Sequence, residues 1–339
     1  MLGLSASALA FWEMSRDRPS SPNVAITTQS HHTTTGIVRE TSTSITGESG
    51  GVSGKPLVSI VRGDSDSQIE AMVRKSVDVL GGIGKFVSPG QRVVVKPPVL
   101  ASDTSCAPDP RVIATVVQIV KDAGGAVIVA ESSGTGSTAY NLDKAGITSA
   151  VGELGVEARD MSEEKPIELA VPRGVVLKEV SILPTIHDCD VLISVPRLKR
   201  HSGATVTISL KNMMGTLPRS EMGRFHRIGL SQCIADLNTV VRPHLTVVDA
   251  GYAMTRTGPT GGDMVKLDTI LASADPVAAD TISARELQKL EERIGLSSQS
   301  RFDVAGVRHI QAAAALRIGS SSPDEMEIIE QVVSSLEEE

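Results

Sequence analysis

The sequence predicts an α/β protein with a mostly parallel sheet covered by helices on both faces, formed as a single large domain after a disordered N-terminal segment. Short β-branched runs alternate with amphipathic segments from residue 56 onward. These runs are continuously apolar, which is typical of strands buried on both faces. Hydrophobic residues make up 40% of the 339-residue chain but aromatic residues only 2%, so the core is expected to be aliphatic.

The strands are predicted from runs rich in Val, Ile and Leu that are bounded by turn residues or charges. In chain order these runs are 57–61, 92–96, 125–130, 190–195, 244–250 and 265–273.

Helices are predicted between the strands. The segment after Asp109-Pro110 has an N-cap followed by proline in the first turn, and Gly124-Gly125 ends it. Residues 231–241 form an amphipathic segment, and 275–290 begin with a second Asp-Pro pair. Alternation of this kind is typical of a sheet with helices packed on both sides.

The N-terminal region divides into two parts. Within residues 1–19, the segment "MLGLSASALAFW" is apolar but too short to span a bilayer, and no positive charge precedes it. It resembles the apolar half of a twin-arginine export signal without its basic start, or else a frayed tail. Export and a cytoplasmic location therefore both stay open. Residues 20–55 are rich in Ser, Thr and Gly and predict a disordered linker, and residues 56–335 form the domain.

Composition excludes several classes of protein. A net charge of −7 and the shortage of aromatic residues argue against nucleic-acid binding. Cys106, Cys189 and Cys233 are widely spaced without a CxxC motif, so we expect buried thiols rather than a disulfide framework, a zinc ribbon or a ferredoxin-type cluster. No nucleotide-binding motif and no transmembrane span is present in the sequence, and any cofactor stays unknown.

Charged residues follow four of the predicted strands. Lys96 and Glu131 end two of them, "PRLKRH" with Lys199 and His201 follows a third, and Asp249 follows the fourth. If these strands are parallel, their carboxyl ends share one edge, where ligands of such sheets bind. Backbone donors from nearby glycines would add to a site for a small anionic molecule. A solvated basic loop is the alternative.

The segment 195–215 carries five basic side chains and no acidic one. If residues 204–210 form a helix, Lys211 and Asn212 lie in its last turn. Lys211 would then complement the helix dipole or, with Asn212, hold a carboxylate or phosphate. Beyond them, residues 219–227 read as a long basic loop with His226, which we interpret as a lid over the site. "GPTGG" at 258–262 suits a backbone nest for an anion.

Further polar candidates lie on or near the helix at 231–241. Asp236 and Asn238 flank Leu237 there, and Asp236 either pairs with the basic cluster or is a solvated helix face. No HxH or HExxH spacing occurs, so no metal site is predicted. In the resulting hypothesis His201 or His226 is the general acid–base, and Asp249 or Asp236 orients it. The anion would be bound by Lys96, Glu131, Lys199, Lys211, Asn212 and Asn238.

Nine ordered segments, from "VVVKPP" through "DVLISVPRLKRH" and "TVTISLKNMMG" to "ASADPVAAD", resemble the bacterial and archaeal family called domain of unknown function number 362. The resemblance covers roughly residues 56 to 332. Eight family positions then carry over: Lys199, His201, Lys211, Asn212, His226, Asp236, Asn238 and Asp249. Pro98 departs from the family pattern, which has Asn there.

The resemblance implies a context for the protein. Many relatives carry an added ferredoxin-like iron–sulfur module, and some have twin-arginine leaders. Because this chain lacks the cysteine run, a redox role would need an electron-transfer partner protein. Our leading hypothesis is an enzyme that acts on a small anionic substrate at the strand-end loops. The alternatives are a non-catalytic exported binding or accessory protein and an iron- or iron–sulfur-linked redox accessory protein.

Overall fold

The described part of the chain is built around one large sheet. The computed structural model describes residues 54–100, 103–296 and 301–334. The strands of the large sheet are β1 (Leu57–Arg62), β2 (Arg92–Lys96), β3 (Ala126–Glu131), β4 (Ala158–Asp160), β7 (Val191–Ser194), β8 (Arg197–His201), β9 (Thr205–Thr207), β10 (Leu245–Thr255), β11 (Asp263–Ser273) and β12 (Glu327–Val332). A separate antiparallel pair is formed by β5 (Ile167–Ala170) and β6 (Glu179–Ile182).

The sheet is mostly parallel, as predicted. Its main row runs β12-β1-β11-β10-β7-β2-β3-β4, and β8 pairs with β10 beside this row. Both neighbours of β11 pair with it antiparallel, whereas the other described pairings along the row are parallel. The carboxyl ends of β2, β3, β7 and β10 therefore lie at one edge.

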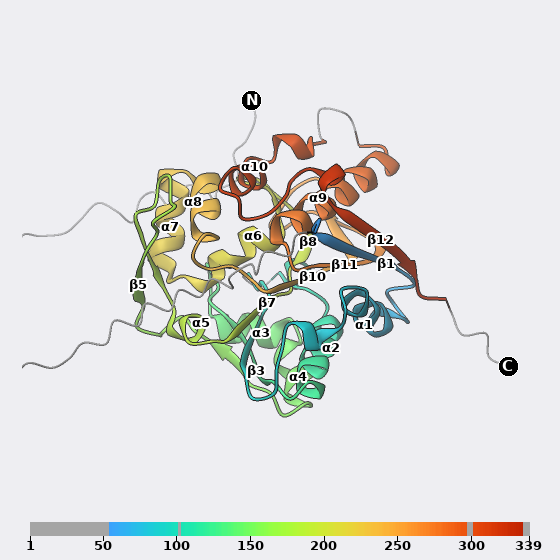
Figure 1. Ribbon diagram of the computed structural model, residues 1–339, viewed down its shortest axis with the longest axis horizontal. Helices are drawn as coiled ribbons and strands as arrows, with labels where there is room; N and C mark the ends of the chain where they lie inside the picture. Colours follow the sequence, from blue (N-terminus) through green and yellow to red (C-terminus); the bar gives the residue numbers. More distant parts are fainter. Residues whose placement is uncertain (1–53, 101–102, 297–300, 335–339) are drawn as a thin grey trace, which may run out of the picture. The chain divides into compact units, whose positions relative to one another are not determined.

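Helices cover both faces of the sheet (Figure 1). The larger ones are α1 (Ile69–Val79), α2 (Pro110–Asp122), α3 (Thr138–Lys144), α4 (Ile147–Gly152), α7 (Arg219–Ile228), α8 (Leu230–Leu237), α9 (Pro276–Arg293) and α10 (Arg308–Ala315). Two short helices are α5 (Pro184–His187) and α6 (Ser209–Asn212). Residues from α1 to α4 share one aliphatic core with the sheet, and residues from α6 to α10 share the other.

The predicted capping of α2 is present. The side chain of Asp109 accepts a hydrogen bond from the backbone N–H of Arg111, and Pro110 occupies the first turn. Asp275 caps α9 in the same way, with its carboxylate accepting from Val277 and Ala278. The half-buried carboxylates at these two helix starts satisfy donors that the first turn leaves unpaired.

The basic segment folds differently from the prediction. "PRLKRH" is not a loop, because residues 197–201 form β8, which pairs with both β10 and β9. Residues 205–207 are strand rather than helix, and only the four residues of α6 are helical before Asn212 ends it. The expected basic loop at 219–227 is the helix α7, which buries Met222 and Phe225.

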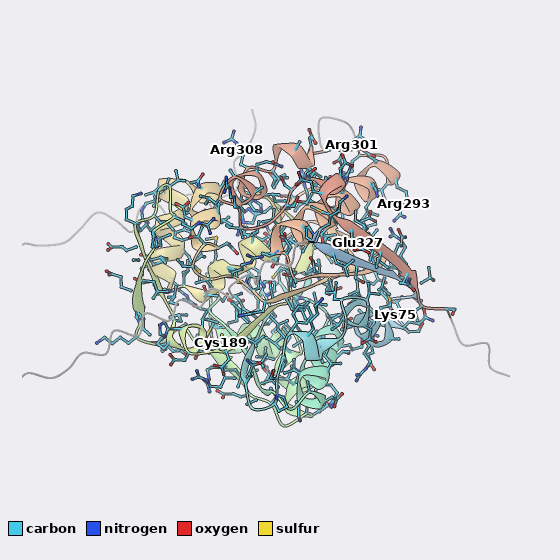
Figure 2. The ribbon with its side chains drawn as sticks, in the orientation of Figure 1. Lys75, Cys189, Arg293, Arg301, Arg308 and Glu327 are labelled. Carbon is cyan, nitrogen blue, oxygen red and sulfur yellow. The ribbon has the colours of Figure 1, made fainter. Side chains whose placement is uncertain are left out.

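The three cysteines are buried and free, as expected; Cys189 is labelled in Figure 2. The predicted export remnant at 1–19 and nearly all of the predicted linker at 20–55 lie outside the described residues. Within the described ranges, no helix is both long and apolar enough to cross a bilayer.

Candidate functional site

The ends of three parallel strands are joined by one hydrogen-bonded group. Lys96 Nζ at the end of β2 lies 2.6 Å from Glu131 Oε2 at the end of β3 and 2.8 Å from Asn212 Oδ1. The Asn212 amide donates in turn to the Lys96 carbonyl at 2.9 Å and to Ser194 Oγ, at the end of β7, at 3.0 Å. The predicted convergence of strand ends is therefore real, and Asn212 connects them to α6.

The Lys96–Glu131 pair is sealed from solvent. Lys96 is 0% exposed and Glu131 2% exposed. Burial raises the pKa of Glu131 to about 7 and lowers the pKa of Lys96, and in each case the partner charge opposes the shift. A Cβ placed on Gly215 would lie 1.9 Å from Glu131 Oε1 and 2.6 Å from Lys96 Nζ, so the pair requires glycine at this position.

Helix α6 is fixed by buried polar groups from distant parts of the chain. The carboxylate of Asp280, on α9, accepts hydrogen bonds from the N–H groups of Ser209 (2.7 Å) and Leu210 (3.1 Å). Asn238 Nδ2 donates to the Leu210 carbonyl at 2.9 Å, and the Ser209 hydroxyl pairs with Thr246 Oγ1 at 2.7 Å. The backbone that carries Lys211 is thus held from several directions.

The side chain of Lys211 differs from its neighbours. No hydrogen bond or ion pair joins its Nζ to any residue in the described ranges, and its surface is partly accessible. Burial, together with the positive charges of Lys199 and Lys96, lowers its pKa to about 7. Near neutral pH the amine is therefore divided between its charged and neutral forms.

Lys199, like Lys211, has no carboxylate partner in the described ranges. It is 2% exposed, and its Nζ donates to the carbonyl of Cys106. Burial lowers its pKa to about 8. Lys199 and Lys211 thus place two poorly compensated amines in one region.

His201 is held as a neutral imidazole. Its Nδ1 accepts hydrogen bonds from the N–H groups of Gly203 (2.9 Å) and Ala204 (3.1 Å). Burial, and then the charges of Lys211 and His226, lower the pKa of His201 to about 2. With Nδ1 accepting, the remaining proton lies on Nε2, so His201 is suited to donate a hydrogen bond.

Two more histidines lie within electrostatic reach of Lys211. His226 is exposed on α7, and partial desolvation with the charge of Lys211 lowers its pKa. His309, on α10, is fully buried 4.0 Å from Asp280, and burial with the Lys211 charge lowers its pKa to about 3. Histidines from β8, α7 and α10 therefore all feel the charge of one lysine.

Asp249 and Asp236, predicted to orient a histidine, have other partners in the structure. Asp249 pairs with Arg197 at 2.7 Å and accepts from the Asp109 N–H at 2.7 Å. Asp236 accepts from the N–H groups of Val176 and Leu177, at 2.7 and 2.8 Å. Asp249 therefore fixes the start of β8 against α2, and Asp236 fixes the loop between β5 and β6 on α8.

Four predicted anion ligands also serve the fold. Lys96 and Glu131 neutralise each other, and the amide of Asn212 is used by Lys96 and Ser194. Asn238 donates to the carbonyls of Leu210 and Ile234 inside the protein. These side chains support α6 from inside the protein. Of the predicted anion ligands, Lys199 and Lys211 are the ones without such a partner for their charge.

The predicted backbone nest at 258–262 already has an anionic group. The Gly261 N–H donates to Asp103 Oδ2 at 3.2 Å. A Cβ on Gly258 would lie 1.9 Å from the Arg200 carbonyl, so this turn is packed directly on β8. Its role is to hold the strand that carries Lys199 and His201.

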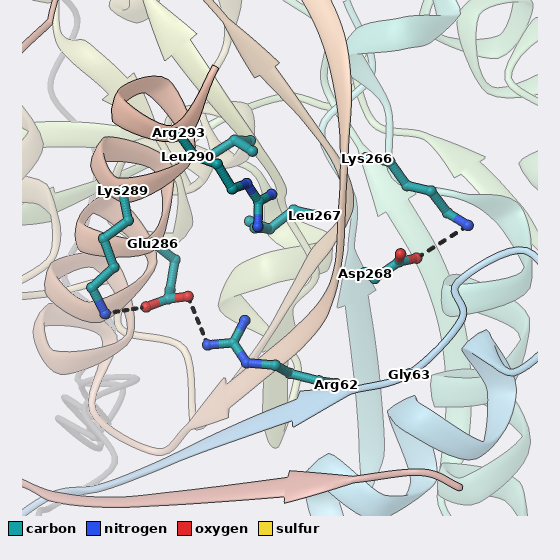
Figure 3. Close-up of a pocket in the computed structure, with 9 residues that line it drawn as sticks. All are labelled: Arg62, Gly63, Lys266, Leu267, Asp268, Glu286, Lys289, Leu290 and Arg293. Carbon is teal, nitrogen blue, oxygen red and sulfur yellow. Dashed lines mark hydrogen bonds and ion pairs between the residues drawn. The ribbon is translucent and has the colours of Figure 1, made fainter. Parts of the chain in front are cut away.

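Two hollows flank the region without containing its lysines. One of about 330 Å³ is lined by the Gly203–Thr205 turn, Ser231, Gly306 and Arg308, and lies beside His201. The other, of about 470 Å³, lies between β1, β11 and α9 (Figure 3). Its basic groups Arg62 and Lys289 are both paired with Glu286, and Lys266 lies beside three aspartates, whereas Arg293 has no ion pair among the described residues. Neither Lys199 nor Lys211 lines this hollow, so it is separate from the strand-end group.

The sequence prediction missed Asp280, His309 and Arg197. Asp280 belongs to "ASADPVAAD", where only the helix start was recognised. Its partners are 70 and 71 residues away in the chain, so no local pattern could indicate this contact. In the described ranges no group of three or more His, Cys, Asp or Glu side chains could hold a metal ion.

Comparisons with known proteins agree with the sequence resemblance. The family described as Domain of unknown function (DUF362) matches residues 93–285, which is more than half of the chain. A curated relative, the Thylakoid-associated protein sll1697 of Synechocystis sp. (strain ATCC 27184 / PCC 6803 / Kazusa), is 28% identical over 262 residues. That alignment covers 71% of this chain and 80% of the relative.

Two solved structures align with part of this chain. Lactate racemase apoprotein from Thermoanaerobacterium thermosaccharolyticum aligns with a TM-score of 0.48 and 10% identity, over 68% of this chain and 57% of the racemase. A structural-genomics protein from Thermotoga maritima aligns with a TM-score of 0.39 and 12% identity, over 68% and 59% of the two chains. The present chain therefore matches less than two thirds of either protein.

Proposed function

The chain belongs to the family Domain of unknown function (DUF362), and on that premise we propose that it is an enzyme acting on a small anionic substrate. The observation that carries this proposal is the environment of Lys211. Its backbone is fixed by Asp280 and Asn238, yet its amine has no partner in the described ranges. A buried cation without a counter-charge is costly to the fold, and a bound anion would relieve that cost.

The positive charge around Lys211 also supports the proposal of an anionic substrate. Lys199 has a carbonyl partner but no carboxylate one, and the nearby Lys96–Glu131 pair is neutral as a unit. A carboxylate or phosphate group placed between Lys199 and Lys211 would meet two ammonium groups. His201 could donate from Nε2 to the same ligand.

An enzyme explains the arrangement better than a binding protein does. Simple retention of an anion is served best by fully charged groups, such as arginine. Here the pKa of Lys211 is about 7 and that of Lys199 about 8, values suited to proton exchange near neutral pH. His226 is exposed beside them and could exchange protons with solvent.

The first prediction tests anion binding. Phosphate, sulfate or a dicarboxylate should raise the melting temperature by a few degrees more than chloride at matched ionic strength, because a ligand at about 100 times its Kd stabilises by about 2.7 kcal/mol. Lys211→Met should lose most of this gain. Lys75→Met, at an exposed position on α1 (Figure 2), is the matched control and should keep it.

Differential scanning fluorimetry of the three proteins decides the matter. Equal stabilisation of wild type and Lys211→Met would place the anion elsewhere and remove the basis of the proposal. A bound anion without turnover of any carboxylate or phosphate ester would instead favour the non-catalytic binding protein.

A further inference from the structure

We infer that Lys211 is a covalent attachment point, at which its amine condenses with the carbonyl group of a small oxo acid to form an imine. This inference rests on the proposed function and names its substrate class: an aldehyde or ketone that also bears a carboxylate. Three features support it: the state of the amine, the groups around it and the fixed backbone that carries it.

The amine of Lys211 is free to react. Imine formation requires an unprotonated nitrogen whose lone pair is available to attack the carbonyl carbon. Most lysines in proteins are instead charged or engaged in ion pairs. Lys211 Nζ has no hydrogen bond or ion pair in the described ranges and is partly accessible. Its burial next to Lys199 and Lys96 favours the neutral form.

The surrounding groups suit an oxo acid in particular. The charged groups near Lys211 are Lys96, paired with Glu131, and Lys199, which donates to the Cys106 carbonyl but has no carboxylate partner in the described ranges. The rings of His201 and His226 also lie within its electrostatic reach. A carboxylate on the substrate would therefore lie toward Lys199, and the imidazoles would lie near the carbonyl oxygen.

On α10 and α9, His309 and Asp280 complete the titratable groups around this lysine. Asp280 is occupied with the N–H groups of Ser209 and Leu210. No carboxylate in the described ranges is therefore paired with the amine to hold it protonated.

The support beneath the amine is rigid. Asp280, Asn238 and Thr246 fix the backbone of α6, and Asn212 ties its end to the ends of β2 and β7. A reacting atom on a fixed backbone loses little freedom when it bonds to its substrate. Such anchoring exceeds what a surface cation would need.

The step balances without an added redox partner. The lone pair of Nζ forms a bond to the carbonyl carbon as the C=O π bond breaks, and one proton passes from the nitrogen to the oxygen to give a carbinolamine. The oxygen then takes a second proton and leaves as water when the C–O bond breaks, while the nitrogen forms the C=N bond and loses its remaining proton. His226, which is exposed and within electrostatic reach of Lys211, is the group that would relay these protons.

The test is reductive trapping of the full-length protein. Pyruvate or glyoxylate is added near neutral pH with cyanoborohydride, which supplies the hydride that converts an imine into a stable secondary amine. We expect one lysine adduct per chain, located at Lys211 by peptide mass spectrometry and counted apart from any adduct on the α-amino group. At this pH the neutral fraction of Lys211 exceeds that of an ordinary lysine by about a thousandfold, so Lys75 should stay unlabelled.

Lys211→Arg is the decisive variant, because arginine keeps the positive charge but cannot form the imine. It should retain the anion-induced rise in melting temperature and lose the adduct. Acetone, a ketone without a carboxylate, should label wild type far less than pyruvate does. Equal adduct formation in Lys211→Arg, or equal labelling by acetone and pyruvate, would overturn the inference.

The two proposals fail separately. If anions stabilise wild type through Lys211 but no adduct forms, the covalent role is wrong and the anion site stands. If anions do not stabilise wild type and no adduct forms, both proposals fall.

Discussion

Lys211 shows how neighbouring residues set the charge of a single side chain. The unfolded chain keeps its proton up to the ordinary lysine pKa of 10.5, whereas the folded chain releases it at about 7. Between these values the unfolded state binds more protons, so the free energy of unfolding rises with pH. The destabilising effect of Lys211 is therefore complete below pH 7 and disappears toward 10.5. Lys199, with a pKa of about 8, acts in the same direction.

This residue-scale argument predicts that Lys211→Met is more stable than wild type in slightly acidic, anion-poor buffer. The advantage should decrease as pH rises from 7 toward 10.5, because wild-type Lys211 loses its proton in the folded state and the cost of its buried charge disappears. Thermal unfolding across this pH range measures the difference. For Lys75→Met, whose lysine lies on the surface of α1, the difference from wild type should not depend on pH. A constant difference for Lys211→Met as well would show that its pKa is close to the ordinary value.

At the scale of elements, α6 and the turn after it are fixed by contacts rather than by intrinsic helix preference. A four-residue helix is too short to be stable alone. Gly215 follows it and lets the backbone approach Glu131 and Lys96 more closely than any Cβ allows. The Ser132 N–H also donates to the Gly215 carbonyl at 3.1 Å, which joins this turn to the end of β3.

Gly215→Ala should accordingly separate Lys96 from Glu131 or displace α6. Because disruption of a buried ion pair typically costs about 3–5 kcal/mol, we expect a loss of roughly that size. Gly152→Ala is the control, since a Cβ there meets no atom within 4 Å and its backbone is helical; it should be neutral or slightly stabilising. Chemical denaturation compares the two. A Gly215→Ala protein as stable as Gly152→Ala would mean that the pair adjusts freely.

The same elements show what sequence patterns can predict. The strands of the core were predictable because each is a short apolar run, and α2 because Asp109 and Pro110 mark its start. The strand β8 was not, because its alternating basic residues are typical of a loop, and only its pairing with β10 makes it a strand. The contacts of Asp236 and Asp280 depend on tertiary structure. The charged residues of the site were therefore identified more readily than their partners.

At the scale of the whole domain, the sheet order explains how distant residues form one site. Lys96 and Asn212 are 116 positions apart and still form hydrogen bonds, because β2 lies directly beside β7 in the sheet. The strand β1 also joins parts of the chain that are far apart in the sequence. It lies between β12 and β11, pairing parallel with one and antiparallel with the other, so it connects the two ends of the described chain.

This position predicts where the domain can be shortened. A chain that begins at Lys55 keeps β1, the hydrogen bond from Glu327 N to the Pro56 carbonyl, and the contact of Lys55 Nζ with the Asp324 carbonyl. A chain that begins at Gly63 loses the whole strand and leaves β12 without its partner. Three buried side chains of the two cores, Val58, Ile60 and Val61, are lost with it, and each contributes about 1.5–3 kcal/mol when fully buried.

We therefore expect the chain from Lys55 to unfold cooperatively at nearly the full-length melting temperature, and the chain from Gly63 to show no cooperative transition. The summed loss of about 5 kcal/mol or more is comparable with the whole stability of a typical domain. Circular dichroism during heating distinguishes the two chains. Cooperative unfolding of the Gly63 chain at the wild-type temperature would contradict the structural role of β1. Failure of the Lys55 chain would place an essential contact before it. Retention of anion stabilisation by the Lys55 chain would further show that the site around Lys211 is complete within the domain.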